Sequence, residues 1–299
     1  MQQQNSICDF ATSDSWVILS PIEQSIKKKI ESVGTPLKDW DINIYRGVLT
    51  GCNEAFIIDS EKREEILANC QTEDERQRTA ELIRPILRGR DIKRYGYVDN
   101  GLYLINTHNG IRGRIPRIKI EDYPAVKAHL DQYWDRIATR ADKGDTPYNL
   151  RNCAYLEDFN KPKVVYMEIQ TDNPEEGYPF PCYSYDNKRC VVLNTAYIMS
   201  SETLDPRYVL GILNSRLGKF LVKLYVTQLQ ERQFRMLSQY VMKFPIARPT
   251  REQEKEMTHL VQGILVNKSI ASENRIDELA FQIYKLSEQE IKYLTDRCL

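Results

Sequence analysis

Apolar residues recur every three or four positions in three stretches of this chain. In residues 21–34, three isoleucines stand four positions apart and a glycine closes the stretch, which predicts a helix that ends there. Residues 205–226 open with Asp-Pro and keep the same spacing, so we predict one long amphipathic helix. Beyond Pro249 the spacing continues almost to the C-terminus and predicts two or three further helices.

Compact apolar runs predict strands in the first 200 residues or so. Residues 42–48 and 55–58 flank a turn that contains two glycines, which predicts two strands around that turn. Longer strands are predicted within residues 161–169 and 190–199, where Val, Ile and Tyr cluster. The shorter predicted strands are residues 92–97 and 102–105.

Helix start and stop signals separate some of these strands. An Asp-Ser pair can cap a short helix within residues 59–69. Thr72 followed by Glu75 forms a capping box, which predicts a second helix that runs until Gly89. A proline opens a third predicted helix, residues 124–139, with Trp134 among the residues of its apolar face.

The order of these elements divides the chain into three regions. We predict a loose N-terminal segment (1–20), a mixed region (21–203) and a helical region (204–299) that acts as a spacer or docking bundle. Strands and helices do not alternate regularly, which favours an α+β fold over a doubly wound sheet.

Composition excludes several classes of protein. The 299 residues suffice for a substantial core, and 42 basic residues balance 42 acidic ones. The seven cysteines form no CxxC pair, so they indicate reduced thiols rather than a zinc knuckle or a disulfide framework. No apolar run approaches the roughly 20 residues that span a bilayer. We therefore expect a soluble, cytoplasmic protein without a membrane partner.

The charge is balanced in sum but not along the chain. Residues 84–119 hold nine basic and two acidic residues, and residues 207–235 hold six and one. Tyr, Asn and His side chains lie between the basic residues of the first stretch, as on surfaces that neutralise phosphates and contact bases. The alternative is a solvated surface whose cations pair with acids elsewhere.

Signals for catalysis are absent from the sequence. Neither GxGxxG nor GxxxxGK followed by Ser or Thr occurs, and Gly47 and Gly51 lack the helix of a phosphate site. These two glycines indicate instead that the backbone closely approaches a neighbour. Glu168 and Gln170 lack the carboxylate-x-Lys pattern of nucleases, so we expect Glu168 to end a buried strand or contact a neighbour. No catalytic or metal-binding residue is predicted.

Several segments resemble the TaqI-like specificity domains of bacterial adenine-specific DNA methyltransferases and fused restriction-modification enzymes. The segments, in family order, are DWDINIYRGVLTGCNEAFIID, ELIRPILRGRDIKRYGY, GLYLINTHNG, YPAVKAHL, DKGDTPYNLRNCAY, KPKVVYMEI, YVLGILNSRL and IDELAFQIYKLSEQEI. Together they cover about residues 35–295, and RPILRGRDIKRY and YRGVLTGCNEAF are the most specific.

The resemblance implies a target-recognition domain for double-stranded DNA. In this family a separate N-terminal methyltransferase domain or subunit, with a nuclease in some members, binds S-adenosylmethionine and methylates a flipped adenine. Its catalytic tetrapeptide, Asp, Asn or Ser followed by Pro-Pro and Tyr or Phe, does not occur here. We therefore expect no cofactor and no catalysis in this chain, which is either a fragment or a stand-alone specificity subunit. The parent enzyme is expected to be an adenine-specific methyltransferase, a type II restriction endonuclease, or both.

The resemblance implies that the backbone at the glycine turn approaches DNA or the flipped-base pocket of a partner domain. The resemblance and the basic stretch together suggest DNA-contacting residues. Arg90 could instead pair with Asp91 or cap a helix, and Asn53 could serve only to complete a turn. The phosphate candidates are Arg46, Arg88, Arg90, Lys93 and Arg94. The base-edge candidates are Asn53, His108, Asn109, Arg112, Arg114, Tyr148 and Arg151.

Two other functions stay open at the level of sequence. One is a nuclease or methyltransferase whose site the motifs do not reveal. The other is a protein-interaction module, in which the helices beyond residue 206 bind a partner and the basic surface meets acidic groups.

Overall fold

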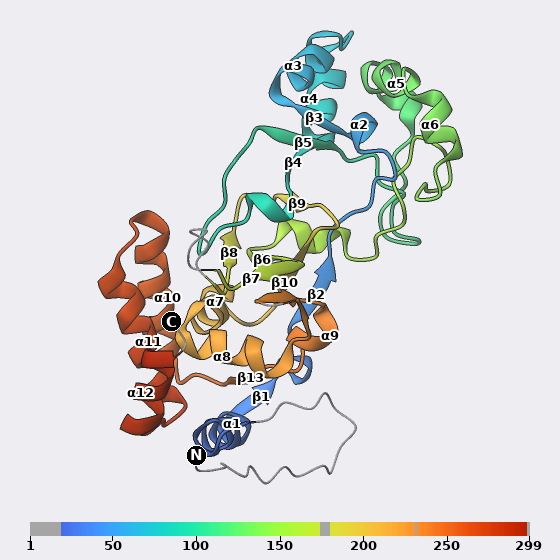
Figure 1. Ribbon diagram of the computed structural model, residues 1–299. Coiled ribbons are helices and arrows are strands. Elements are labelled where there is room, and N and C mark those ends of the chain that lie inside the picture. Colours follow the sequence, from blue (N-terminus) through green and yellow to red (C-terminus); the bar gives the residue numbers. More distant parts are fainter. Residues whose placement is uncertain (1–18, 174–179, 231, 298–299) are drawn as a thin grey trace.

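The computed structural model describes residues 19–173, 180–230 and 232–297. Helices and several small sheets build an elongated molecule (Figure 1), which confirms the α+β prediction. Most of the predicted N-terminal segment, residues 1–18, lies outside the described residues. Across the described ranges, no helix is both long and apolar enough to cross a membrane.

The elements of regular structure are short, and strands occur throughout the chain. The helices are α1 (Pro21–Val33), α2 (Asn53–Phe56), α3 (Ser60–Ala68), α4 (Glu73–Leu82), α5 (Pro124–Asp131), α6 (Trp134–Thr139), α7 (Pro206–Asn214), α8 (Arg216–Tyr225), α9 (Ser238–Val241), α10 (Arg251–Val266), α11 (Ile270–Ile283) and α12 (Glu288–Arg297). The strands are β1 (Gly34–Pro36), β2 (Asn43–Arg46), β3 (Ile57–Asp59), β4 (Ile83–Leu87), β5 (Leu102–Ile105), β6 (Lys163–Met167), β7 (Ile169–Thr171), β8 (Tyr183–Asp186), β9 (Val191–Val192), β10 (Ala196–Ser200), β11 (Gln228–Gln230), β12 (Gln233–Arg235) and β13 (Pro245–Ala247).

A four-stranded antiparallel sheet, in the order β2-β10-β6-β8, separates two hydrophobic cores. Neighbouring side chains on a strand point to opposite faces of the sheet. On β6, Val164 and Tyr166 accordingly belong to one core, whereas Val165 belongs to the other. This sheet joins the two ends of the molecule in Figure 1.

One core lies in the upper part of Figure 1, where α3–α6 surround the sheet β3-β5-β4-β9. The other core gathers α1, α7, α8 and α10–α12 on the opposite face of the central sheet. β1 pairs with β13, so residues 34–36 join strand to strand with residues 245–247. The boundary between the two cores is therefore not at residue 203 of the sequence. Helix α1 and strand β1, from the predicted mixed region, pack with the helical region.

The two strands predicted around the glycine turn exist as β2 and β3, but a helix lies between them and the second strand begins later than predicted. Residues 53–56 form helix α2, and the strands on its two sides enter different sheets: β2 pairs with β10, and β3 with β5. The helix predicted from Thr72 begins as expected, since the Thr72 side chain accepts a hydrogen bond from the Glu75 amide. It ends at Leu82, because Pro85 disfavours helical backbone at the residue before it, and β4 follows.

Three other predicted elements are split. Tyr133 leaves helical geometry between α5 and α6, and Trp134 is 44% exposed rather than part of the buried face. Ser215 adopts an extended backbone and caps α8 through the Gly218 amide, which divides the predicted long helix into α7 and α8. The strand predicted in residues 190–199 is divided into β9 and β10.

A buried carboxylate ties α1 to α12. Glu290 accepts hydrogen bonds from Lys29 Nζ at 2.6 Å, Ser25 Oγ at 2.7 Å and the Ser287 amide at 2.7 Å. Burial alone would raise the pKa of Glu290, but these donors outweigh it and lower the pKa to about 2.

We expect Glu290→Gln to lower the free energy of unfolding at pH 7 by about 1–2 kcal/mol, once solvent screening at half-exposed Lys29 is allowed for. A carboxyl whose folded pKa is depressed stabilises the fold above its unfolded pKa and loses this contribution as the pH falls. The difference from wild type, measured by urea denaturation, should therefore shrink between about pH 4.3 and pH 2. Glu288→Gln on the same helix is the control, and a difference that does not vary with pH would contradict the assignment.

Candidate nucleic-acid interface

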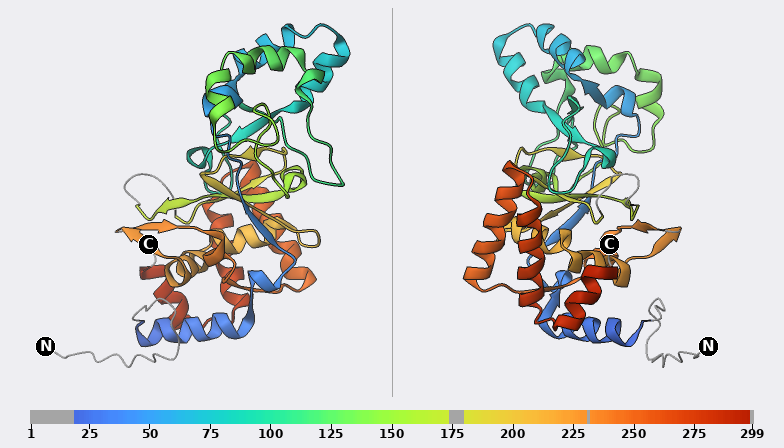
Figure 2. Two further views of the ribbon diagram at one scale, coloured as in Figure 1. Left: turned by 90° about the vertical axis from the view of Figure 1, so that its right-hand side faces the viewer. Right: turned by 60° about the vertical axis from the view of Figure 1, so that its left-hand side comes forward.

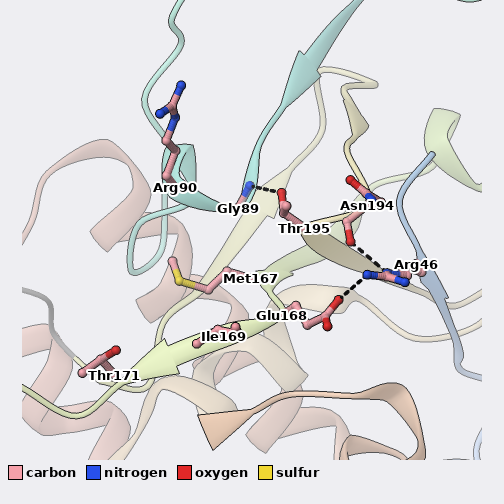
Figure 3. A pocket seen from close by; sticks show the side chains of 9 residues that line it. All are labelled: Arg46, Gly89, Arg90, Met167, Glu168, Ile169, Thr171, Asn194 and Thr195. Atoms are coloured by element: carbon pink, nitrogen blue, oxygen red, sulfur yellow. Dashed lines mark hydrogen bonds and ion pairs between the residues drawn. The ribbon is translucent and has the colours of Figure 1, made fainter. Parts of the chain in front are cut away.

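A pocket of about 450 Å³ opens beside the end of β2, next to the short helical turn η2 (Gly89–Asp91). Strands β2 and β7, turn η2 and the loop before β10 contribute to its wall (Figure 3). Its lining residues are Arg46, Gly89, Arg90, Met167, Glu168, Ile169, Thr171, Asn194 and Thr195.

Two arginines on this surface share one carboxylate. Arg46 donates from Nε to the Asn194 carbonyl at 2.8 Å, and its terminal nitrogen lies 2.8 Å from Glu168 Oε2 (Figure 3). Arg235, at the end of β12, reaches Oε1 of the same carboxylate at 3.0 Å. Glu168 is buried, whereas both arginines are 45% exposed. One carboxylate between two guanidinium groups leaves this part of the wall net positive.

The glycine after Arg46 brings β2 against the chain's own backbone. A Cβ on Gly47 would lie 2.3 Å from the carbonyl oxygens of Val192 and Leu193, so only glycine fits there. The backbone is closely approached at Gly47, as predicted, but by the segment between β9 and β10 of the same chain rather than by DNA or a partner domain.

The basic residues around η2 differ in what they contact. Arg88 forms a bidentate pair with Asp91, at 2.9 Å and 2.8 Å, and the hydrogen bonds raise the pKa of Arg88. Arg94 is 15% exposed and contacts Glu273 Oε2 from Nε at 3.0 Å and from its terminal nitrogen at 2.6 Å. Asp91 therefore pairs with Arg88, not Arg90, and both Arg88 and Arg94 face internal partners.

Arg90 is directed toward solvent, and the half-buried Lys93 lies beside it. The Arg90 side chain is exposed and extends away from the Arg46–Glu168 pair (Figure 3). No hydrogen bond or ion pair to its guanidinium exists within the described part of the chain. Lys93 donates to the Arg90 carbonyl at 3.0 Å, which places its ammonium group close to the same turn.

A second pocket, of about 710 Å³, is formed mainly by the loop of residues 109–117. Gly110 and Gly113 adopt positive φ angles of 73° and 77°, which this tight loop requires. Asn109 donates to Asp145 Oδ1 at 2.9 Å and Arg114 pairs with Glu157, so both have partners. The exposed Arg112 has none among the residues that the structure describes.

Two further base-edge candidates, Asn53 and His108, form hydrogen bonds with residues close to them in sequence. Asn53 accepts a hydrogen bond from Thr50 at 2.6 Å and thus completes its turn. His108 Nδ1 accepts from the Gly110 amide, and burial together with the charge of Arg84 lowers the pKa of His108.

The last two candidates, half-buried Tyr148 and exposed Arg151, each contact an acidic side chain. Tyr148 donates to Asp131 at 2.6 Å, and Arg151 lies 3.4 Å from Asp142 while 61% exposed. Neither pair is buried, so either could exchange for a ligand at little cost.

One aromatic residue links the two pockets. The Tyr155 hydroxyl donates to the Arg46 carbonyl at 2.8 Å, and its ring stacks on Tyr45 of β2 with centroids 4.2 Å apart. Cys153 and Ala154, just before Tyr155, line the second pocket. Tyr155 therefore connects β2, at the first pocket, to the segment that lines the second.

Sequence reasoning expected Glu168 to contact a neighbour, which is confirmed, but it did not identify the neighbours as Arg46 and Arg235. The pairing of two distant arginines on one acid has no local signal. Within the described ranges, no group of three or more His, Cys, Asp and Glu residues could hold a metal ion.

Comparisons with known proteins show the family and the fold. The curated protein "Type II methyltransferase M.BstVI" from Geobacillus stearothermophilus is 24% identical over 298 residues, covering 96% of this chain and 47% of that protein. The chain thus spans about half the length of this relative. A solved structure titled as the type IIL restriction-modification enzyme MmeI in complex with DNA aligns with a TM-score of 0.60 and 13% identity, over 88% of this chain and 36% of that one. The model of the TaqI-like C-terminal specificity domain matches residues 84–246, more than half of the sequence. The chain belongs to the family of TaqI-like C-terminal specificity domains.

Proposed function

We propose that this chain is the sequence-specific DNA-recognition module of a bacterial restriction-modification adenine methyltransferase. The observation that supports it best is that two exposed guanidinium groups of the family-matched residues 84–246, those of Arg90 and Arg112, line a pocket and have no partner among the described residues. Such groups are available to phosphates and to base edges.

The two pockets suggest different roles. Arg46 and Arg90 line the first pocket, and Lys93 donates to the Arg90 carbonyl beside it. We assign these three residues to the phosphate backbone, which fixes the position of the duplex. The loop of residues 109–117 is assigned to base edges, with Arg112 suited to guanine. We do not assign Arg88 and Arg94 to phosphates, because their guanidinium groups already pair with carboxylates of the same chain.

Methyl transfer belongs, in this proposal, to a separate domain that binds S-adenosylmethionine. The sequence lacks the catalytic tetrapeptide, and the chain matches 47% of a curated methyltransferase. The recognition module would hold duplex DNA so that an adenine can be flipped into that other domain. The place of action would be the bacterial cytoplasm, where the genomic DNA lies.

Duplex binding should be strongly salt-dependent. We expect Arg90→Ala to weaken binding to all sequences alike, by about 3- to 10-fold, and to reduce the slope of log affinity against log salt by about one. Arg112→Ala should instead relax the preference at one base pair of the site. Fluorescence anisotropy with random and selected duplexes measures both quantities.

The control for loss of a positive charge is Arg251→Ala on α10, an exposed residue remote in sequence from both pockets. Its affinity and salt slope should match those of wild type. A wild-type response independent of salt would overturn the proposal, and so would metal-dependent cleavage of plasmid DNA by this chain.

A further inference from the structure

A two-stranded ribbon projects from the body of the molecule. Strands β11 and β12 pair in antiparallel fashion, and β12 continues the pairing to β7, which leaves β11 as the free edge. All three residues of β11 are exposed. Both views of Figure 2 show this orange ribbon extending away from the helices beside it.

Strand β12 of the ribbon is anchored to the body of the molecule. Phe234 is buried and stacks on Phe180 with ring centroids 5.2 Å apart. The Arg232 carbonyl accepts a hydrogen bond from the Asp172 amide at 2.7 Å, and Asp172 in turn pairs with Lys219 of α8 at 2.9 Å. These contacts fix β12 in place before any ligand binds.

The side chains that the ribbon presents are suited to recognition. Exposed edge strands are commonly protected by short length, a bulge, Lys, Pro or inward-pointing charges. Strand β11 is short and has a register shift between Gln228 and Gln230, but its side chains include no charge. This edge carries Gln228 and Gln230 instead, with 46% exposed Leu229 between them. The exposed Arg232 beside them has no side-chain partner within the described ranges. Amide and guanidinium groups are those that read adenine and guanine edges.

The ribbon also continues the surface already assigned to phosphates. Its neighbour β7 contributes Ile169 and Thr171 to the first pocket, and Arg235 at its base shares Glu168 with Arg46. DNA held by the cations of that pocket would pass close to the ribbon.

We propose that the β11–β12 ribbon enters the major groove of bound DNA, where Gln228 and Gln230 read adenine and Arg232 contacts an adjacent base or phosphate. This inference rests on the proposed function. A two-stranded ribbon fits the major groove, about 12 Å wide, but not the minor groove of about 6 Å. A Gln side chain can bond to N6 and N7 of adenine in that groove at the same time.

The test uses the full chain and a duplex selected from a random pool for tight binding. Gln228→Ala/Gln230→Ala changes no charge, so binding to random duplex and the salt slope should stay at wild-type values. Preference for the selected duplex should fall by about 10- to 100-fold. The matched control is Gln282→Ala/Gln289→Ala, which removes two exposed glutamines from α11 and α12.

A second measurement locates the contact on the DNA. Replacing each adenine of the selected duplex in turn by 7-deazaadenine removes the N7 acceptor from the major groove. At one or two positions the wild-type chain should lose about tenfold in affinity, whereas the double variant should lose none. Circular dichroism of each variant checks that the fold is retained.

Four other results would overturn the inference, and each points to a different role for the ribbon or for the chain. A double variant that keeps the wild-type preference leaves the proposed function standing but removes the ribbon from base reading. Equal weakening on all duplexes would assign the ribbon to the backbone. Weaker binding to a methyltransferase domain with intact DNA preference would identify β11 as an edge for strand addition by a protein. A wild-type chain that binds no duplex overturns both proposals.

Discussion

Replacing Lys163 with Met is expected to lower the free energy of unfolding by about 3–5 kcal/mol, because it leaves a buried carboxylate without its counter-charge. Lys163 Nζ lies 2.5 Å from Asp186 Oδ2, and both side chains are fully buried. The pair joins neighbouring strands β6 and β8 at the centre of the molecule.

The surroundings explain why the pair is tolerated. Burial lowers the pKa of Lys163, and the negative charge of Asp186 opposes that shift. Asp186 also accepts hydrogen bonds from the Tyr97 hydroxyl at 2.9 Å and the Cys190 amide at 3.0 Å, and Lys163 donates to the Phe159 carbonyl at 2.8 Å. Every strong polar group of the pair therefore has a partner.

Chemical denaturation of wild type, Lys163→Met and Lys163→Met/Asp186→Leu measures the effect. The double variant removes both charges and should recover much of the loss, since apolar replacement of a buried pair is often close to neutral. A single variant within about 1 kcal/mol of wild type would show that water or a second cation reaches Asp186.

Local signals in the sequence predicted where several elements begin, but not which elements pair. Asp59 and Thr72 cap α3 and α4 as expected, because capping depends on residues three positions apart. The pairing of β2 with β10 depends instead on contacts between residues about 150 positions apart. A turn with two glycines fits a hairpin equally well, which is why α2 and the change of sheet were not predicted.

At the candidate site, too, local signals in the sequence do not show which residues contact one another. The sequence identified the basic stretch near η2, yet it could not separate exposed Arg90 from Arg88, whose partner lies three residues away. Strands β11 and β12 are three residues each, too short for a periodic pattern, and so the ribbon was assigned to the helical region. Only the fold shows that it borders the first pocket.

Arg94→Ala is expected to lower the free energy of unfolding by about 2–3 kcal/mol and to leave the salt dependence of DNA binding unchanged. Arg94 joins the turn after η2 to α11 through Glu273 and also donates to the carbonyls of Pro181 and Asn214. Its removal leaves these acceptors without their donor and Glu273 without its counter-charge.

A double-mutant cycle with Glu273→Ala separates the ion pair from the hydrogen bonds to the carbonyls. Because Glu273 is about one-third exposed, Glu273→Ala alone should cost less than Arg94→Ala. Anisotropy titrations on the same variants provide the functional control: Arg90→Ala should reduce the salt slope by about one, and Arg94→Ala should not. An Arg94→Ala variant with wild-type stability and a reduced salt slope would return Arg94 to the phosphate contacts. Arg94 would then have to release Glu273 and the two carbonyls in order to bind a phosphate.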